Sequence, residues 1–177
     1  MATWDTRGLR GSTLEDLVNH TNEHFHKAGL ALVQKIPTPI KPIEIDQETR
    51  QIKLAYFEQK STVDYIGVVQ GIPICFDAKE CKSDTFPLAN IHQHQVDFMR
   101  DFEKQEGVAF FLLHFTERNE LYYLRLSKLL EFWKRMEEGG RKSFLYTELE
   151  PDFFVKVQRG SVICYLDALQ KDLDLRC

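Results

Sequence analysis

A tight turn at Val68 to Ile72, between two apolar segments, constrains the fold of this chain more than any other feature. With Gln70 and Gly71 as a two-residue hairpin loop, the two strands pair so that Asp64 lies opposite Asp77. Their Cβ atoms would then be about 5 Å apart. A shift of one residue in the pairing would turn a strand over and separate the two carboxylates. The turn therefore predicts a β-hairpin that carries a pair of facing acidic side chains.

The second strand of this hairpin carries a further charge beside the acidic pair. Because side chains alternate across a strand, Asp77 and Lys79 share one face with Cys75. The apolar residues between them point to the other face and can fill a core: Ile74, Phe76 and Ala78. A strand with one apolar face and an Asp-x-Lys sequence on the other is an unusual way to build a simple hairpin.

Facing carboxylates destabilise a hairpin, and a divalent cation between Asp64 and Asp77 would remove that conflict. Oxygen-only ligands favour a hard ion such as Mg²⁺ or Mn²⁺. Such an ion would polarise a phosphate, while Lys79 would orient and help to activate a water molecule. The alternative is a surface hairpin in which Asp77 and Lys79 form a neighbouring charge pair, because Asp-x-Lys is common by chance. The hairpin alone does not decide between a metal-dependent nuclease and this structural interpretation.

The order of the expected elements indicates the fold class. A helix from about Ser12 ends at Gly29, a strand follows at 31–33, and an insertion precedes the hairpin. Further expected elements are helices near 88–102 and 127–138, strands at 108–115 and 121–126, and a mixed remainder with a short strand near Val155. This order predicts an α/β fold, a mixed sheet flanked by helices, in a single domain spanning residues 1–177.

The insertion, at about residues 36–58, differs in composition from the expected core. Pro37, Pro39 and Pro42 exclude a helix interior or a central strand, and the segment is polar with β-like patches such as 43–45. Long insertions in compact domains are more often functional. We expect this one to project from the core, with basic residues available to contact a DNA backbone: Lys35, Lys41, Arg50 and Lys53.

Glu15, in the first turn of the first helix, has two interpretations. It fits a capping box that begins at Ser12, and it is also placed to be a further carboxylate near a metal. A side chain committed to the cap cannot also reach a metal freely. The sequence leaves both roles open.

Gln95 lies in the helix after the hairpin, beside two histidines. His92 and His94 are two residues apart, which places them on different helix faces and excludes a zinc pair. Arg141 and Lys142 follow the glycine pair that ends a later helix. We interpret that segment as a helix stop with a candidate phosphate-contacting pair, because it lacks the spacing of a phosphate-binding loop.

Composition limits the remaining possibilities. The net charge of −4 and the pI of about 5.9 argue mildly against a nucleic-acid binder, but bound cations reverse the sign of a carboxylate pocket. The chain has no apolar run long enough for a membrane span and no signal-peptide pattern at its start. Its four cysteines share no metal-ligand spacing. We therefore expect reduced thiols, no membrane association and a cytoplasmic, nucleoid-associated protein.

A series of short motifs, in this order, resembles the RecU-type Holliday junction resolvases of the PD-(D/E)xK nuclease superfamily. The resemblance covers nearly the whole chain, and its motifs lie at 7–8, 10–19, 35–40, 55–57, 60–65, 76–80, 86–88, 92–95, 115–117 and 139–143. It implies a restriction-endonuclease-like core in which the proline-rich insertion is a stalk that enters the junction. It also implies a homodimer that nicks opposed strands of a four-way junction symmetrically with Mg²⁺ or Mn²⁺.

The resemblance assigns roles to individual residues. Asp64, Asp77 and Lys79 match the catalytic motif, Glu15 matches an acidic metal-site residue, and Gln95 matches a glutamine found in related enzymes. Residues expected near the site or on the DNA are Arg7, Arg10, Lys35, Lys41, Lys60, Thr62, Arg141 and Lys142.

Two departures from the family pattern accompany these matches. The family usually has Glu where this chain has Asp77, which is one methylene shorter, and the N-terminal arm is short. Two other functions stay open: a restriction-like or repair nuclease acting on other DNA, and a junction-binding recombination factor without catalysis. The sequence does not reveal whether the protein also acts on a recombinase or a branch-migration helicase.

Overall fold

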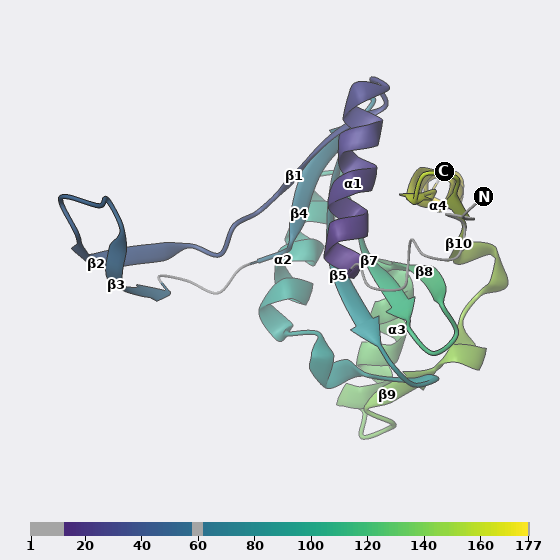
Figure 1. Ribbon diagram of the computed structural model, residues 1–177. Helices are drawn as coiled ribbons and strands as arrows, with labels where there is room; N and C mark the ends of the chain where they lie inside the picture. The colour runs from purple at the N-terminus through teal and green to yellow at the C-terminus, as the bar shows by residue number, and fades with distance from the viewer. Residues whose placement is uncertain (1–12, 58–61, 177) are drawn as a thin grey trace.

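The computed structural model describes residues 13–57 and 62–176. At its centre is a six-stranded mixed sheet with the strand order β1-β4-β5-β7-β8-β10 (Figure 1). β5 and β7 are parallel, and the other neighbours are antiparallel. The strands are β1 (Ala31–Lys35), β4 (Tyr65–Val69), β5 (Ile72–Cys81), β7 (Val108–Phe115), β8 (Glu120–Arg125) and β10 (Phe154–Val155).

Within the described residues, four α-helices surround this sheet. They are α1 (Leu14–Lys27), α2 (Gln93–Lys104), α3 (Leu126–Glu137) and α4 (Tyr165–Asp174). α1 lies along β1 and also contacts β5 and β12, whereas α2 packs on β7 and β5. The expected α/β fold, a mixed sheet flanked by helices, is confirmed. No helix in the described part of the chain is long and apolar enough to cross a membrane.

The remaining elements are short. Two small sheets pair β6 (Thr85–Pro87) with β9 (Ser143–Leu145), and β11 (Val157–Gln158) with β12 (Val162–Ile163). The described residues also form the 3₁₀ turns η2 (Leu88–Asn90), η3 (Tyr146–Glu148) and η4 (Pro151–Phe153).

Stacked aromatic rings connect four strands of the sheet. Phe76 on β5 lies between Tyr65 on β4 and Phe110 on β7, with ring centroids 4.8 Å from each, and Tyr123 on β8 stacks on Phe110 at 4.2 Å. α1 and α4 cover this face, since Tyr65 bonds Asn19 and Tyr165 packs on Phe76. Every residue of β7 is buried, as expected for a strand covered on both faces. These contacts fix β5 rigidly beside its neighbours.

The central hairpin has the predicted pairing. Tyr65 pairs with Phe76 and Val69 with Ile72, so Gln70 and Gly71 form the loop. Both loop residues have positive φ, 47° and 92°, as a type I′ turn requires. The predicted register is therefore confirmed.

Some predicted boundaries were wrong. The helix expected at 88–102 is interrupted: η2 ends at Asn90, and α2 begins only at Gln93. α3 begins at Leu126, one residue before the expected start, and has no side-chain cap. The C-terminal helix α4, in the segment expected to be mixed, was missed.

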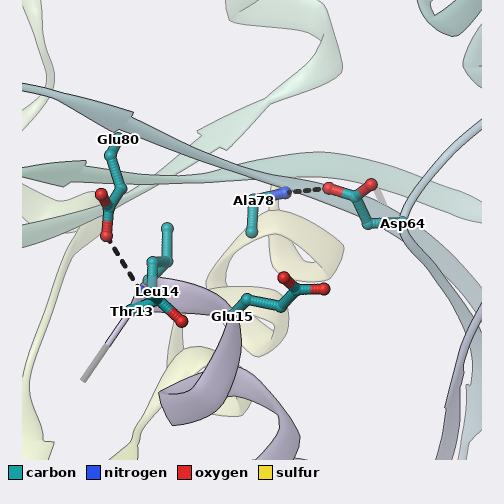
Figure 2. A pocket seen from close by; sticks show the side chains of 6 residues that line it. All are labelled: Thr13, Leu14, Glu15, Asp64, Ala78 and Glu80. Carbon is teal, nitrogen blue, oxygen red and sulfur yellow. Dashed lines mark hydrogen bonds between the residues drawn. The ribbon is translucent and has the colours of Figure 1, made fainter.

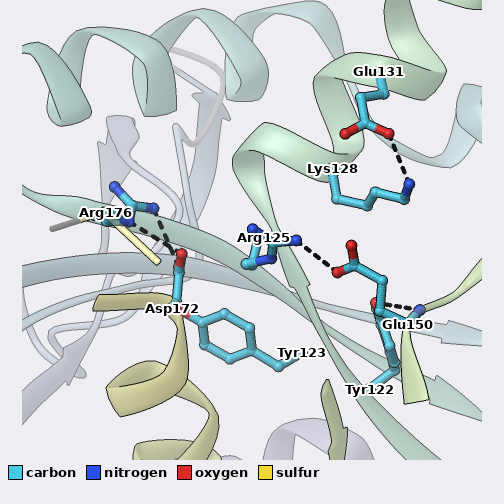
Figure 3. Close-up of polar contacts among 8 residues, drawn as sticks. All are labelled: Tyr122, Tyr123, Arg125, Lys128, Glu131, Glu150, Asp172 and Arg176. Atoms are coloured by element: carbon cyan, nitrogen blue, oxygen red, sulfur yellow. Dashed lines mark hydrogen bonds and ion pairs between the residues drawn. The ribbon is translucent and has the colours of Figure 1, made fainter. Parts of the chain in front are cut away.

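α4 was missed because its buried face includes Asp172, whose carboxylate is satisfied in part by Tyr123, which is distant in sequence (Figure 3). Tyr123 Oη donates to Asp172 Oδ2 over 3.0 Å, and Arg176 donates to both carboxylate oxygens. Arg176 also bonds Glu103 of α2 at 2.7 Å. A nearby pair, Arg125 and Glu150, ties β8 to the segment before η4.

The proline-rich insertion forms a hairpin that projects from the body (Figure 1). Its strands, β2 (Ile40–Ile45) and β3 (Ile52–Phe57), pair only with each other. We call residues 36–57 the stalk. The expectation of a polar segment was wrong, because the stalk exposes many large apolar side chains: Ile40, Ile43, Ile45, Ile52, Leu54, Tyr56 and Phe57.

The stalk leaves the body beside Asp64. The Ile36 N–H donates to the Asp64 carbonyl oxygen over 2.7 Å, directly after Lys35 has paired with Tyr65. The described part of the stalk therefore begins next to the acidic pair of the hairpin.

Gly67 permits close contact between β1 and β4. A Cβ atom there would lie 2.3 Å from the Leu32 carbonyl oxygen and 2.6 Å from the Val33 Cα atom. Both neighbours are backbone, so they cannot move away without distorting the strand. We expect Gly67→Ala to lower the free energy of unfolding by about 2 kcal/mol, measured by chemical denaturation. An unchanged denaturation midpoint would contradict this expectation. Gly29→Ala is the control for backbone strain, because its Cβ atom would lie in open space while its φ is positive.

Candidate active site

The acidic pair lies where β5 extends past Tyr65, the first residue of β4. Asp64 immediately precedes β4, and its N–H donates to Asp77 Oδ1 over 2.9 Å. In return, the Ala78 N–H donates to Asp64 Oδ2 over 3.2 Å (Figure 2). The Asp64 carboxylate thus accepts a β5 N–H that lies beyond the paired part of β4. The structure brings Asp64 and Asp77 together.

Asp77 is completely buried and is held by three donors. Besides the Asp64 N–H, Gln95 Nε2 donates to Oδ2 over 2.8 Å and Lys79 Nζ lies 2.6 Å from the same oxygen. Gln95 is itself fixed, because its Oε1 accepts the His92 N–H at the start of α2. Lys79 is partly exposed, so its ammonium group can be reached from solvent. The structure brings Asp77, Lys79 and Gln95 together.

The pKa of Asp77 is raised from its ordinary value of 3.8 to about 7, mainly by burial and also by the neighbouring Asp64 carboxylate, while Lys79 opposes the shift. A buried, hydrogen-bonded carboxylate with a raised pKa is typical of a functional site. The electrostatic conflict is one that a bound cation would relieve.

We expect Asp64→Asn to stabilise the metal-free protein at pH 8 by about 1 kcal/mol, because it removes the charge facing Asp77. The amide keeps an oxygen that can accept the Ala78 N–H. A raised folded-state pKa on a carboxyl group means that stability falls as pH rises from about 4 to about 7. The gain should therefore be large above pH 7 and small at pH 5. Thermal unfolding at both pH values measures it, and equal shifts in Tm would contradict it.

Glu15 approaches the pair from α1, across a small cavity. The cavity has a volume of about 250 Å³, and its lining is formed by Thr13, Leu14, Glu15, Asp64, Ala78 and Glu80 (Figure 2). The proposed capping box from Ser12 to Glu15 was wrong: Thr13 is the cap, and its partner is Asp16. The Glu15 side chain is therefore not used by the cap and forms an ion pair with Lys35.

The donor set fits a hard divalent cation. Asp64 lies beside the fully buried Asp77, and two further carboxylates, those of Glu15 and Glu80, line the adjoining cavity. As placed, no group of three or more His, Cys, Asp or Glu side chains within 13–57 and 62–176 is arranged to hold a metal ion. Asp64 and Asp77 would thus be the main protein ligands, with Glu15 next in reach.

The other predicted site residues are more scattered. Thr62 is half-buried, two residues before Asp64, and Lys41 is exposed on the stalk. Arg141 lies 4.0 Å from Glu148, and the Lys142 carbonyl accepts the Leu88 N–H of η2. Lys35, expected on DNA, is paired with Glu15. Arg7, Arg10 and Lys60 lie outside the described residues.

Two features of the site differ from the sequence interpretation. The His92 and His94 rings are stacked with centroids 5.4 Å apart, so placing them on different faces was wrong; His92 precedes the helix. Glu80, at the end of the Asp-Ala-Lys-Glu sequence, lines the cavity and was not considered. Alternation along the strand puts Glu80 on the same face as Ala78, and this spacing could have indicated that both line one cavity.

Comparisons with known proteins identify the family of this chain. A family model described as recombination protein U, RecU, matches residues 9–171. A protein of Pediococcus pentosaceus named Holliday junction resolvase RecU is 40% identical over 172 residues, which cover 94% of this chain and 86% of that protein. One of the same name from a Geobacillus species is 44% identical over 147 residues, covering 81% and 73%.

Among solved structures, Archaeoglobus fulgidus Hjc, a Holliday junction resolvase from an archaeal hyperthermophile, aligns with a TM-score of 0.41 and 10% identity, over 64% of this chain and 77% of that one. The family match and the two bacterial relatives each cover most of the chain. The chain belongs to the recombination protein U, or RecU, family.

Proposed function

We propose that this protein is a divalent-metal-dependent endonuclease that resolves Holliday junctions by symmetric nicking, in recombination and repair. The observation that carries the proposal is the placement of Asp64 beside the buried Asp77, whose carboxylate accepts the Asp64 N–H and contacts Lys79 and Gln95. This arrangement fits metal-assisted phosphodiester hydrolysis, and the family's curated members are named junction resolvases.

Each residue of the site has a chemical task in this reaction. Asp64 and Asp77 would hold Mg²⁺ or Mn²⁺, with Glu15 contributing from α1. When bound, the metal supplies Lewis-acid stabilisation of the charge that develops on the phosphate. Lys79, partly exposed beside Asp77, orients the attacking water and stabilises its loss of a proton. Gln95 keeps the Asp77 carboxylate in one orientation through its two hydrogen bonds.

The stalk is the element that we assign to junction selectivity. It begins next to Asp64 and exposes Tyr56 and Phe57, whose rings can stack on unpaired bases. Lys41 adds positive charge, and Arg7, Arg10, Lys60, Arg141 and Lys142 are the further DNA contacts that we propose. The chain acts as one nuclease domain with this stalk, on cytoplasmic, nucleoid DNA.

We propose a homodimer because symmetric nicking needs two active sites. Leu32, Val68 and Pro73 form an exposed row across β1, β4 and β5, and the stalk adds further exposed apolar surface. Exposed apolar surface of this extent marks an interaction site more often than free surface. Dimerisation through these regions would bury it.

Incubation of the protein with a labelled four-way junction and a linear duplex, each with Mg²⁺, Mn²⁺ or a chelator, tests the function. We expect paired nicks in the junction that require the metal, and little cleavage of the duplex. Equal cleavage of both substrates would establish a restriction-like or repair nuclease instead. Tight junction binding without cleavage in either metal would establish a non-catalytic recombination factor.

A further inference from the structure

The first turn of α1 is held at two points by the strands that carry the acidic pair. Glu80 Oε1 on β5 accepts the Leu14 N–H over 2.9 Å. On β4, Tyr65 Oη donates to the Glu15 carbonyl over 3.4 Å and to Asn19 Oδ1 over 3.0 Å. Glu80 directly follows Lys79, and Tyr65 directly follows Asp64, so each holding residue adjoins a residue of the proposed site. The position of Glu15 therefore depends on these two contacts.

The contact from Glu80 differs from an ordinary helix cap. The Thr13 hydroxyl accepts the Asp16 N–H, and the first helical N–H, that of Leu14, has Glu80 as its acceptor. A carboxylate at a helix N-terminus is also favoured by the helix dipole. The bond joins residues 66 positions apart, so it fixes the helix to the strand and not only to itself.

The place of Glu80 relates this bond to the acidic pair. Alternation along β5 puts Glu80 on the same face as Ala78, away from Asp77 and Lys79. Glu80 and Glu15 line the same cavity, Glu80 from β5 and Glu15 from α1, and the Asp64 carboxylate lies beside Ala78 (Figure 2). Loss of the bond would let the start of α1, and Glu15 with it, move away from Asp64.

We propose that Glu80 is a positioning residue: through the Leu14 N–H it sets the distance between the Glu15 carboxylate and Asp64, and so the metal concentration that cleavage requires. This inference rests on the proposed function. His114, buried on β7, lies next to this carboxylate, with Nδ1 3.7 Å from Glu80 Oε1.

If Glu80 were itself a metal ligand, the expected metal affinity of one variant, Glu80→Gln, would be different. Glu80→Gln keeps an oxygen that can accept the Leu14 N–H but removes the negative charge. If Glu80 acts through the bond, this variant behaves like the wild type, whereas Glu80→Ala does not. If Glu80 is itself a ligand, both variants lose metal affinity alike.

The test is single-turnover cleavage of a labelled four-way junction across a Mg²⁺ titration. We expect Glu80→Ala to raise the half-maximal Mg²⁺ concentration about tenfold, the size of effect typical for partners that orient ligands, and Glu80→Gln to restore it. Glu117→Ala, an exposed glutamate in the turn after β7, is the matched control and should leave the curve unchanged.

A double-mutant cycle separates positioning from general destabilisation. If Glu80 acts through Glu15, Glu80→Ala should have no further effect on the Mg²⁺ curve once Glu15→Ala is present. Additive effects, or a wild-type curve for Glu80→Ala in folded protein, would overturn the inference. Thermal unfolding of each variant shows that folded protein is compared.

Failure of this inference and failure of the proposed function give different results. Absence of cleavage by the wild type would refute the function alone, and amide hydrogen exchange at Leu14 would then test the contact. Faster exchange in Glu80→Ala and not in Glu80→Gln supports it, and equal exchange rates overturn it.

Discussion

Asp77→Asn should bind a four-way junction as the wild type does and cleave it at least about a thousandfold more slowly. The substitution keeps the size of the buried side chain, and its remaining oxygen can still accept from Gln95 and Lys79, while the contact with the Asp64 N–H is lost. It removes the charge that holds the metal, whose electrostatic stabilisation is worth several kcal/mol. A loss of about 4 kcal/mol corresponds to a thousandfold change in rate.

Single-turnover cleavage and gel-shift binding, both with Mg²⁺, measure the two halves of this expectation. Asp97→Asn, an exposed carboxylate of α2, is the matched control and should cleave normally. Asp77→Glu restores the acid that is usual at this position and should retain metal-dependent cleavage. Undiminished cleavage by Asp77→Asn would refute the assigned site.

The hairpin was predictable because its determinants are local. Gln70 and Gly71 can adopt the positive φ angles of a type I′ turn, and once the turn is placed, pairing brings Asp64 to Asp77. Proline positions likewise excluded 37–42 from the core. In each case a rule of backbone geometry acts within a few residues and needs no knowledge of the remaining fold.

The unpredicted features depend on contacts between distant segments. Asp172 is polar, yet it lies on the buried face of α4 because its carboxylate accepts hydrogen bonds from Tyr123, on a distant strand, and from Arg176. Glu80 belongs to the site because α1 begins opposite it, which no spacing along the chain reveals. The sequence could also not show that Asp16, and not Glu15, completes the helix cap. Local rules cannot choose between two carboxylates that fit almost equally well.

Deletion of residues 37–57 should abolish most of the preference for junctions over duplex and preserve the fold of the body. β2 and β3 pair only with each other, so their removal breaks no strand of the central sheet. At the base of the stalk, the Ile36 N–H bonds the Asp64 carbonyl, so the two chain segments that flank the stalk are already held together. Residues 58–63 remain to connect β1 to β4 after the deletion.

The size of the effect follows from the aromatic side chains that the stalk presents. Tyr56 is 48% exposed and Phe57 is 73% exposed. Stacking of a base on an aromatic ring contributes about 1–3 kcal/mol, so losing two such contacts should cost about 3 kcal/mol, or about a hundredfold in affinity for the junction. Tyr56→Ala/Phe57→Ala should therefore reproduce most of the effect of the deletion.

Competition binding between a labelled junction and unlabelled duplex measures this preference, and Ile43→Ala, which removes an exposed apolar side chain without a ring, is the control. The deletion variant should still nick DNA with Mg²⁺, because Asp64, Asp77 and Lys79 lie outside the deleted segment. If the deletion leaves substrate preference unchanged, the stalk is not the selective element. The carboxylate site would then belong to a nuclease whose selectivity comes from the body of the protein.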